Sequence, residues 1–193
     1  MIWPVIIMYG YICGKVVKIT PKYIICDNNG IGYLIIVPNP YNFILNQDYK
    51  IYVHQYVKED VLDLYGFKED EEKEMFLKLI SVSGIGPKSA LSILASASVS
   101  DIAKAIDNGN DAYLKKFPGI GSKASQQIIL DLKGKLNFDG INSAVPNSKL
   151  DDVSDALVAL GYSKKELTKI LAKLDAEKEV GELVKDALRL LVK

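Results

Sequence analysis

The chain has 193 residues, a length that allows about one ordinary domain or a few small ones. Hydrophobic residues make up 49% and charged residues 25%, a balance that is typical of a folded protein and excludes an intrinsically disordered one. The formal net charge is zero, which argues against a uniformly basic protein that coats nucleic acid.

Residues 1–67 are predicted to form an OB-type β-barrel. Apolar, β-branched and aromatic runs predict strands at 9–19, 23–27, 33–37 and 48–57, with a turn at 28–30. Gly10 and Gly14 in the first run predict a bend or bulge of the kind that small closed barrels need. About five strands in about sixty residues fit this fold, which often binds nucleic acids.

The N-terminal segment and the cysteines predict a cytoplasmic protein. Met1–Cys13 is apolar, but it contains Pro4, lacks the basic start of a signal peptide and is too short to span a bilayer. Cys13 and Cys26 lie in strand-like sequence, where free buried thiols are expected in a reducing compartment. His54 has no cysteine or histidine partners nearby in the sequence, so no metal site is predicted.

An acidic pair follows the predicted barrel. Glu59 and Asp60 would repel phosphates, so charge alone favours a solvated hairpin tip. Leu64, Tyr65 and Phe67 are expected to pack the barrel onto the helical part of the chain.

Segment 68–136 is predicted to be all-helical and contains the same seven-residue phrase twice. The copies are Gly84-Ile85-Gly86-Pro87-Lys88-Ser89-Ala90 and Gly119-Ile120-Gly121-Ser122-Lys123-Ala124-Ser125. Two glycines around one isoleucine predict a tight turn between two helices, with the isoleucine packed in the angle between them. Helices are predicted at 70–82, 90–97, 99–108, 112–117 and 123–136.

Each turn is a candidate phosphate site. The helix that follows begins with amide groups that have no intrahelical partner, and its dipole attracts an anion. Gly86 and Gly121 would let a DNA strand approach the backbone closely, and Lys88 and Lys123 add positive charge. Such contacts position the DNA backbone and do not read its sequence. The predicted DNA-binding residues are Gly84, Ile85, Gly86, Lys88, Gly119, Ile120, Gly121, Ser122 and Lys123.

The repetition of the phrase decides between two interpretations. A single copy could be a glycine-rich turn that merely packs two helices, whereas two copies with the same glycine spacing and the same lysine indicate a pair of helix-hairpin-helix motifs. Positive charge is concentrated in the same segment, because residues 75–136 contain eight lysines against four aspartates.

No nucleotide-binding loop is predicted. Pro87 stands before Lys88 where the phosphate-binding loop needs glycine, and Gly134-Lys135 is followed by Leu136 and lacks the upstream glycine. Any ATP-driven work is therefore expected to come from a partner. No catalytic residue and no cofactor are assigned to this chain.

The remaining residues predict a tethered module. Segment 137–148 is rich in Gly, Pro, Asn and Ser and is predicted to be a flexible linker. Three short amphipathic helices are predicted at 150–161, 163–174 and 179–192. Because a unit of about forty-five residues has a small core, residues 149–193 are expected to dock a partner protein.

The combination resembles the RuvA family from about Met8 to the C-terminus. The resemblance is carried by the phrase Glu59–Phe67, by the two repeated turns and by the sequence Ala-Leu-Val-Ala-Leu-Gly-Tyr at 156–162. It implies a multidomain α+β fold with an OB-type barrel, a central tandem helix-hairpin-helix domain and a small C-terminal three-helix domain. Met8-Tyr9-Gly10 looks like the usual start of the family, so residues 1–7 are expected to be an extension or a mis-assigned start.

The resemblance also implies a function. In this family a homotetramer or octamer holds a four-way Holliday junction open, and an acidic pin near the centre, matched here by Glu59 and Asp60, keeps the strands apart. Residues 149–193 would dock a RuvB-type hexameric ATPase that drives branch migration in recombination, DNA repair and the SOS response to DNA damage. A RuvC-type junction resolvase is a further implied partner.

Two alternatives and two departures from the family pattern accompany this interpretation. The chain could be a generic duplex-binding scaffold without junction preference, or a helix-hairpin-helix DNA glycosylase in which Asp139 would be the catalytic aspartate. Ser125 stands where the second turn of the family usually has alanine, and Gln126 and Gln127 replace a commonly charged pair, which predicts a weaker second phosphate site.

Overall fold

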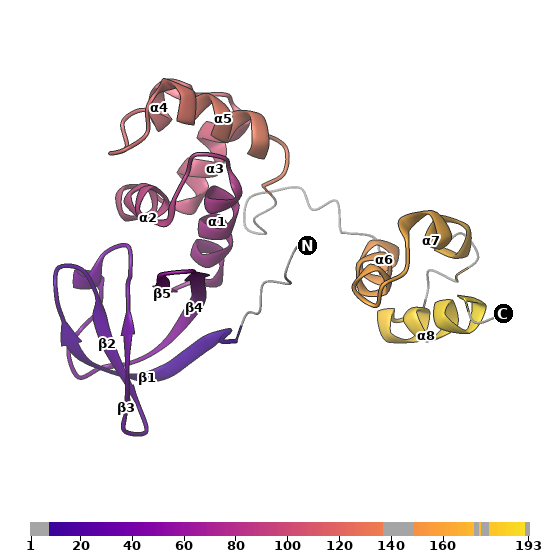
Figure 1. Ribbon diagram of the computed structural model, residues 1–193, viewed down its shortest axis with the longest axis horizontal. Helices are drawn as coiled ribbons and strands as arrows, with labels where there is room; N and C mark the ends of the chain where they lie inside the picture. The colour runs from indigo at the N-terminus through magenta and orange to yellow at the C-terminus, as the bar shows by residue number, and fades with distance from the viewer. Residues whose placement is uncertain (1–7, 137–148, 172–173, 175–177, 192–193) are drawn as a thin grey trace. The chain divides into compact units, whose positions relative to one another are not determined.

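The computed structural model describes residues 8–136, 149–171, 174 and 178–191. It divides the chain into two compact units, Met1–Phe138 and Asp139–Lys193. Figure 1 shows the barrel and the helices α1–α5 in the first unit and the helices α6–α8 in the second. The predicted linker 137–148 and Asp139 lie outside the described residues.

The barrel is built from five antiparallel strands, β1 Tyr11–Ile19, β2 Ile24–Asn28, β3 Ile31–Ile35, β4 Asp48–Lys58 and β5 Val61–Phe67. Their order is β3-β2-β1-β4-β5. A parallel bridge between Ile36 and Tyr65 joins the two edges, with Ile36 donating to Leu64 O and Gly66 donating to Ile36 O, both at 2.8 Å. The sheet therefore closes in the circular order 1-2-3-5-4 of an OB-type barrel, which confirms the predicted fold class.

Glycine and a bulge allow the first strand to bend around this small barrel. A Cβ at Gly14 would lie 2.2 Å from the carbonyl oxygen of Asp27, so only glycine fits between β1 and β2. The register of the two strands shifts between Val16 and Lys18. Between β3 and β4 the chain forms a 3-10 turn at Pro40–Asn42.

The fifth strand differs from the sequence-based expectation. The hairpin tip expected at Glu59 and Asp60 is present as the turn between β4 and β5, but no strand was predicted at 61–67, where β5 pairs with β4 over seven residue pairs from Tyr52–Phe67 to Lys58–Val61. Tyr65 and Phe67 pack into the core of the helices, as predicted, but Leu64 packs against the barrel core.

Five helices follow the barrel: α1 Asp70–Ser81, α2 Pro87–Ser96, α3 Val99–Asp107, α4 Asp111–Leu114 and α5 Ser122–Leu132. Their apolar faces form one core around Phe76, Leu79, Ile93, Ile106 and Ile128. Tyr65 and Phe67 continue this core onto the barrel, and both rings lie about 5 Å from the ring of Phe76. The core therefore fixes the barrel and the helices as one unit.

The second unit has its own core. Helices α6 Lys149–Ala159, α7 Lys164–Leu171 and α8 Val180–Leu191 bury Val153, Leu157, Leu167, Leu183 and Ala187. Gly161 has a φ of +98° after α6, and Ser163 and Glu166 exchange hydrogen bonds at the start of α7. The prediction of three short amphipathic helices is confirmed.

Two further observations concern expectations about thiols and membranes. Cys26 is buried, and burial, with the nearby negative charge of Asp27, raises the pKa of its thiol, but Cys13 is exposed and not buried as predicted. Within the described ranges, no single helix is long and apolar enough to cross a membrane, although α2 and α3 together, bent by 107° at their junction, reach the required length and composition.

Candidate nucleic-acid interface

The first repeated turn joins α1 to α2. The carbonyl of Val82 accepts a hydrogen bond of 3.1 Å from the amide of Ile85. Gly84 has a φ of +85°, which side chains other than hydrogen disfavour. Ile85 is buried in the helical core, and Gly86 is the N-cap of α2. The isoleucine thus fills the angle between the two helices, as predicted.

The second turn joins α4 to α5 and repeats the same backbone path. The carbonyl of Phe117 accepts a hydrogen bond of 3.1 Å from the amide of Ile120, and Gly119 has a φ of +82°. Ile120 is buried, and Gly121 is the N-cap of α5. Both copies are therefore helix-hairpin-helix turns in structure as well as in sequence.

The two turns lie against each other. A Cβ placed on Gly119 would be 3.4 Å from the hydroxyl oxygen of Ser89, which stands in the first turn of α2. Sequence reasoning did not identify Ser89 as a contact, although it is the polar residue of the first copy where the second copy has Ala124. The contact brings the N-termini of α2 and α5 to one region of the surface.

The N-termini of α2 and α5 differ from those of the other helices in this unit. Ser98 caps α3 by accepting a hydrogen bond from the amide of Asp101 at 3.1 Å, and Asn110 caps α4 by accepting one from the amide of Tyr113 at 3.0 Å. At the start of α1, the carboxylate of Glu72 accepts hydrogen bonds from the backbone amides of Lys68 and Glu69 at 3.0 and 3.4 Å. Among the described residues, no side chain caps α2 or α5. In α2, whose first residue Pro87 has no N–H, the amides of Lys88 and Ser89 therefore remain available to an anion, and in α5 those of the first turn do.

Charge in the first turn follows the same division. The first turns of α1, α3 and α4 contain acidic residues, which favour the positive end of the helix dipole. Those of α2 and α5 contain no acid and instead carry Lys88 and Lys123, both exposed. A lysine near a helix N-terminus is repelled by the positive end of the helix dipole. A bound anion at the same place would offset this repulsion, which is a physical reason for the lysine to be there.

Gly86 and Gly121 leave space outside the protein. Their φ values of −100° and −90° are open to any residue, and a Cβ on either would meet nothing within 4 Å. The fold itself does not require glycine at these positions. The absence of a side chain instead leaves room for a ligand to contact the backbone.

The residues of the second turn that depart from the family pattern do not block this surface. Ser125 is buried, and its hydroxyl donates to the carbonyl oxygen of Ser122 at 3.0 Å. Gln127 donates to Asp131 at 2.9 Å, and Gln126 is exposed. Ser122 and Lys123 remain exposed at the start of α5.

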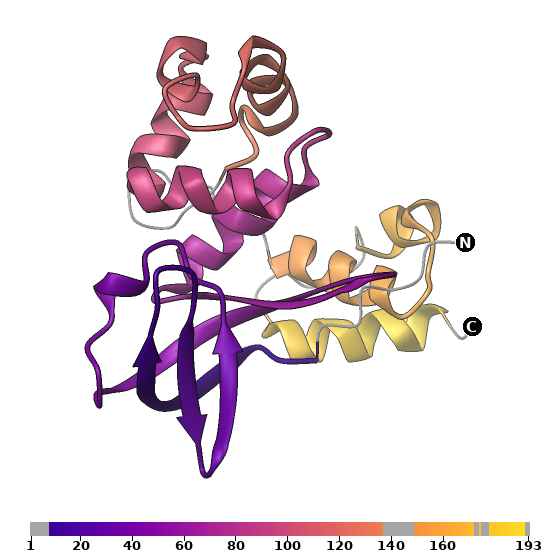
Figure 2. The same cartoon turned by 60° about the vertical axis from the view of Figure 1, so that its left-hand side comes forward.

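Glu59 and Asp60 lie elsewhere on the same unit, at the tip of a two-stranded ribbon. They form the turn between β4 and β5, and both are exposed. Figure 2 shows the ribbon of β4 and β5 extending beyond the other strands of the barrel. The structure therefore places the negative charge of the predicted pin at a narrow projection, separate from the lysine-bearing turns.

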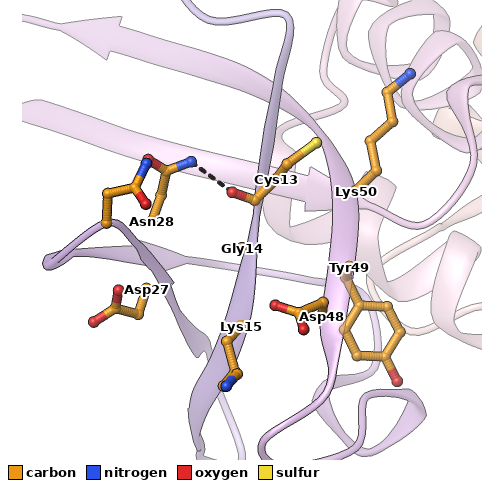
Figure 3. A pocket seen from close by; sticks show the side chains of 9 residues that line it. Cys13, Gly14, Lys15, Asp27, Asn28, Asp48, Tyr49 and Lys50 are labelled. Carbon is orange, nitrogen blue, oxygen red and sulfur yellow. Dashed lines mark hydrogen bonds between the residues drawn. The ribbon is translucent and has the colours of Figure 1, made fainter.

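A hollow of about 590 Å³ lies on the barrel surface between β1, the β2–β3 turn and β4. Figure 3 shows that Lys15 and Lys50 share it with Asp27 and Asp48, so its charges are mixed. The side-chain amide of Asn28 donates to the carbonyl oxygen of Cys13 at 2.6 Å and is occupied within the fold. The hollow is not a phosphate site of the kind that the two turns form.

Three family models match the chain in sequence order. They are the RuvA N-terminal domain at residues 8–66, the SAM-like helix-hairpin-helix tandem at 76–134 and the RuvA C-terminal domain at 148–192. The first match begins at residue 8, where the sequence resemblance also begins.

Curated relatives are similar over almost the whole chain. A Holliday junction branch migration complex subunit RuvA from Acholeplasma laidlawii is 47% identical over 186 residues, and one from Pediococcus pentosaceus is 47% identical over 194 residues. The protein of the same name from Lactobacillus gasseri is 49% identical over 191 residues. Each match covers 96% of this chain and 100% of the relative.

Proposed function

The chain belongs to the RuvA family, and on that premise we propose that it is the DNA-binding subunit of a branch-migration complex, which holds a four-way Holliday junction open for a separate motor. The observation that carries this proposal is the contrast within one unit between two uncapped, lysine-bearing helix N-termini and an acidic ribbon tip.

The two turns would grip a duplex arm through its phosphates. The free amides at the starts of α2 and α5 can donate to phosphate oxygens, and Lys88 and Lys123 add attraction at each contact. Because the turns contact each other through Gly119 and Ser89, they would hold neighbouring phosphates of one arm. Such contacts fix position and not sequence, as a protein that moves along DNA requires.

The acidic tip would act at the crossover. Glu59 and Asp60 repel phosphates, so a tip placed at the centre of the junction would keep the exchanging strands apart. Four copies of the chain would supply one gripping surface for each of four arms, which favours a homotetramer, and two tetramers facing each other would give an octamer.

The second unit would recruit the motor. Its separate core allows residues 149–193 to dock a RuvB-type hexameric ATPase while the first unit holds DNA. In this proposal the protein is not an enzyme and needs no cofactor, because ATP is hydrolysed by the motor. It would work in the cytoplasm in recombination, repair and the SOS response, and a RuvC-type resolvase would use the same open junction.

A gel-shift titration against a synthetic four-way junction and a linear duplex of the same sequence tests the proposal. We expect the junction to bind at least about tenfold more tightly, a difference of about 1.4 kcal/mol. Equal binding to both would leave a generic duplex-binding scaffold, and release of a damaged base by the protein alone would indicate a glycosylase.

The paired substitution E59Q/D60N tests the pin within the same experiment. It should leave junction binding intact or tighter, because a repulsion is removed, while changing how the motor processes the junction. If E59Q/D60N lost junction binding to the same degree as substitutions in the two turns, the pin assignment would be wrong.

A further inference from the structure

The ribbon tip carries an apolar pair that the fold does not bury. Val57 and Leu62 are 61% and 72% exposed and lie directly opposite each other in the β4–β5 register. One residue pair, Lys58 and Val61, separates them from the turn formed by Glu59 and Asp60. Single exposed apolar side chains are ordinary, but these two lie side by side on a projection, where burial in the fold does not account for them.

The two faces of the ribbon explain where the pair points. Side chains alternate along a strand, so Val57 and Leu62 share a face with Val53 and Leu64, which pack in the barrel core. The opposite face includes Tyr65, which packs on the helices. The inner face of the barrel thus continues along the ribbon past Gln55, which lies opposite Leu64, to Val57 and Leu62, which no described residue covers.

We propose that Val57 and Leu62 form an apolar wedge that packs against the faces of nucleobases at the opened crossover of the junction. The inference rests on the proposed function, and it adds to the acidic pin a surface that contacts bases. Apolar side chains of this kind unstack base steps in other DNA-binding proteins. Here the carboxylates would keep phosphates away while the neighbouring apolar pair accepts the bases.

The size and charge of the tip favour bases over a second copy of the chain. A specific protein interface buries on the order of 1,000 Å² or more, which two side chains cannot supply, whereas one exposed base face is of comparable size to the pair. Contact between the tips of two copies would also bring their Glu59 and Asp60 carboxylates together, and like charges repel. A nucleobase face is uncharged and meets no such repulsion.

The test uses the full chain and a synthetic junction with 2-aminopurine, whose fluorescence rises on unstacking, next to the crossover. The double variant V57S/L62S removes the apolar pair. The control I31S/L34S removes two exposed apolar side chains of the barrel that do not form a pair, since Ile31 and Leu34 are 59% and 48% exposed and lie on opposite faces of β3. All four positions are exposed, so neither variant should impair folding.

We expect wild type and I31S/L34S to raise the fluorescence on binding and V57S/L62S to lose most of that rise. Junction affinity of V57S/L62S, measured by gel shift, should stay within about twofold of wild type, as for an ordinary surface substitution. An unchanged fluorescence rise in V57S/L62S would overturn the wedge. So would a fall in its oligomer mass by light scattering, because the pair would then belong to a contact between copies. Failure of the wild type to prefer the junction would instead count against the proposed function.

Discussion

The four glycines of the two turns are required for different reasons. Gly84 and Gly119 have φ values of +85° and +82°, so the backbone itself demands glycine. Gly86 and Gly121 have ordinary backbone angles and open space around the missing side chain. Only a ligand outside the protein gives these two positions a reason to be glycine.

The double variant G86A/G121A should therefore separate folding from binding. We expect its thermal stability to stay within about 1 kcal/mol of wild type, because the entropic gain of about 0.4–1 kcal/mol from Gly→Ala opposes the cost of placing alanine, a poor N-cap residue, at the starts of α2 and α5. Affinity for junction and duplex arms should fall at least about tenfold in a gel shift, because the added methyl groups obstruct the phosphates. The control G84A should lose about 1–2 kcal/mol of stability in urea unfolding, since alanine is strained at a positive φ. Wild-type DNA binding by G86A/G121A would contradict this role.

His54 gives the first unit a predicted pH dependence. It is the only histidine of the chain and is buried beside Phe76. Burial, with a smaller effect of the positive charge of Lys73, lowers the pKa of the imidazole below its ordinary value of 6.5. The unfolded chain then binds a proton that the folded chain excludes, so stability is full above pH 6.5 and falls as the pH drops from 6.5 toward the folded-state pKa.

Urea unfolding at pH 7 and pH 5.5 measures this effect. We expect wild type to lose at most about 1.4 kcal/mol for each pH unit in that range through this group. H54F, which keeps an aromatic ring against Phe76, should lose less over the same interval. Identical losses in the two proteins would show that His54 does not control this range.

At the scale of the element, the N-termini of α2 and α5 are less stable than they could be, and the features that lower their stability favour the binding of an anion. They lack caps within the described structure and carry a lysine where a carboxylate would favour the dipole. K88E/K123E should therefore raise stability by about 0.3–1 kcal/mol per site in urea unfolding. The same variant should weaken DNA binding and reduce the slope of log K against log salt concentration by about one for each lysine.

The variant K22E, which changes an exposed lysine of the barrel, is the charge control. An equal loss of affinity in K22E would indicate that the overall charge of the protein, and not a local site, controls DNA binding.

Sequence patterns predicted most elements because each has one buried face. They missed β5 as a strand because this strand uses both faces, with Leu64 in the barrel core and Tyr65 and Phe67 in the helical core. Mixed burial removes the period-two signal. The predicted start of α2 was late, since Pro87 occupies the first helical position, where proline is favoured. The predicted end of α5 was also late: the helix ends at Leu132, and Gly134 has a φ of +72°.

The candidate interface was predictable where it is contiguous in sequence. The repeated phrase is sufficient to locate both turns, their buried isoleucines and their free helix starts, because all of these are local properties. The contact between Gly119 and Ser89 depends on how distant helices pack. The exposure of Val57 and Leu62 depends on where the barrel ends beneath the ribbon. Neither property can be predicted from a single sequence.

At the scale of the whole molecule, the chain divides into two units with separate cores. Every residue of the proposed DNA-binding surface lies in Met1–Phe138, and the helices proposed to dock the motor lie in Asp139–Lys193. The hydrophobic cluster around Leu157 and Leu183 contains no residue of the first unit. Folding of the barrel and its helices should thus be independent of the C-terminal helices.

Deleting residues 149–193 tests this division of labour. Because the truncated chain keeps the complete core of the first unit, we expect its junction affinity to stay within about twofold of wild type in a gel shift. Stimulation of a RuvB-type ATPase on junction DNA should disappear, since the docking surface is gone, while G86A/G121A should retain direct contact with the motor in a pull-down without DNA. The truncated chain should therefore bind the junction but not stimulate the motor, whereas G86A/G121A should bind the motor but bind DNA weakly. Loss of junction binding on truncation would mean that the C-terminal unit contacts DNA itself, and the docking role would have to be abandoned.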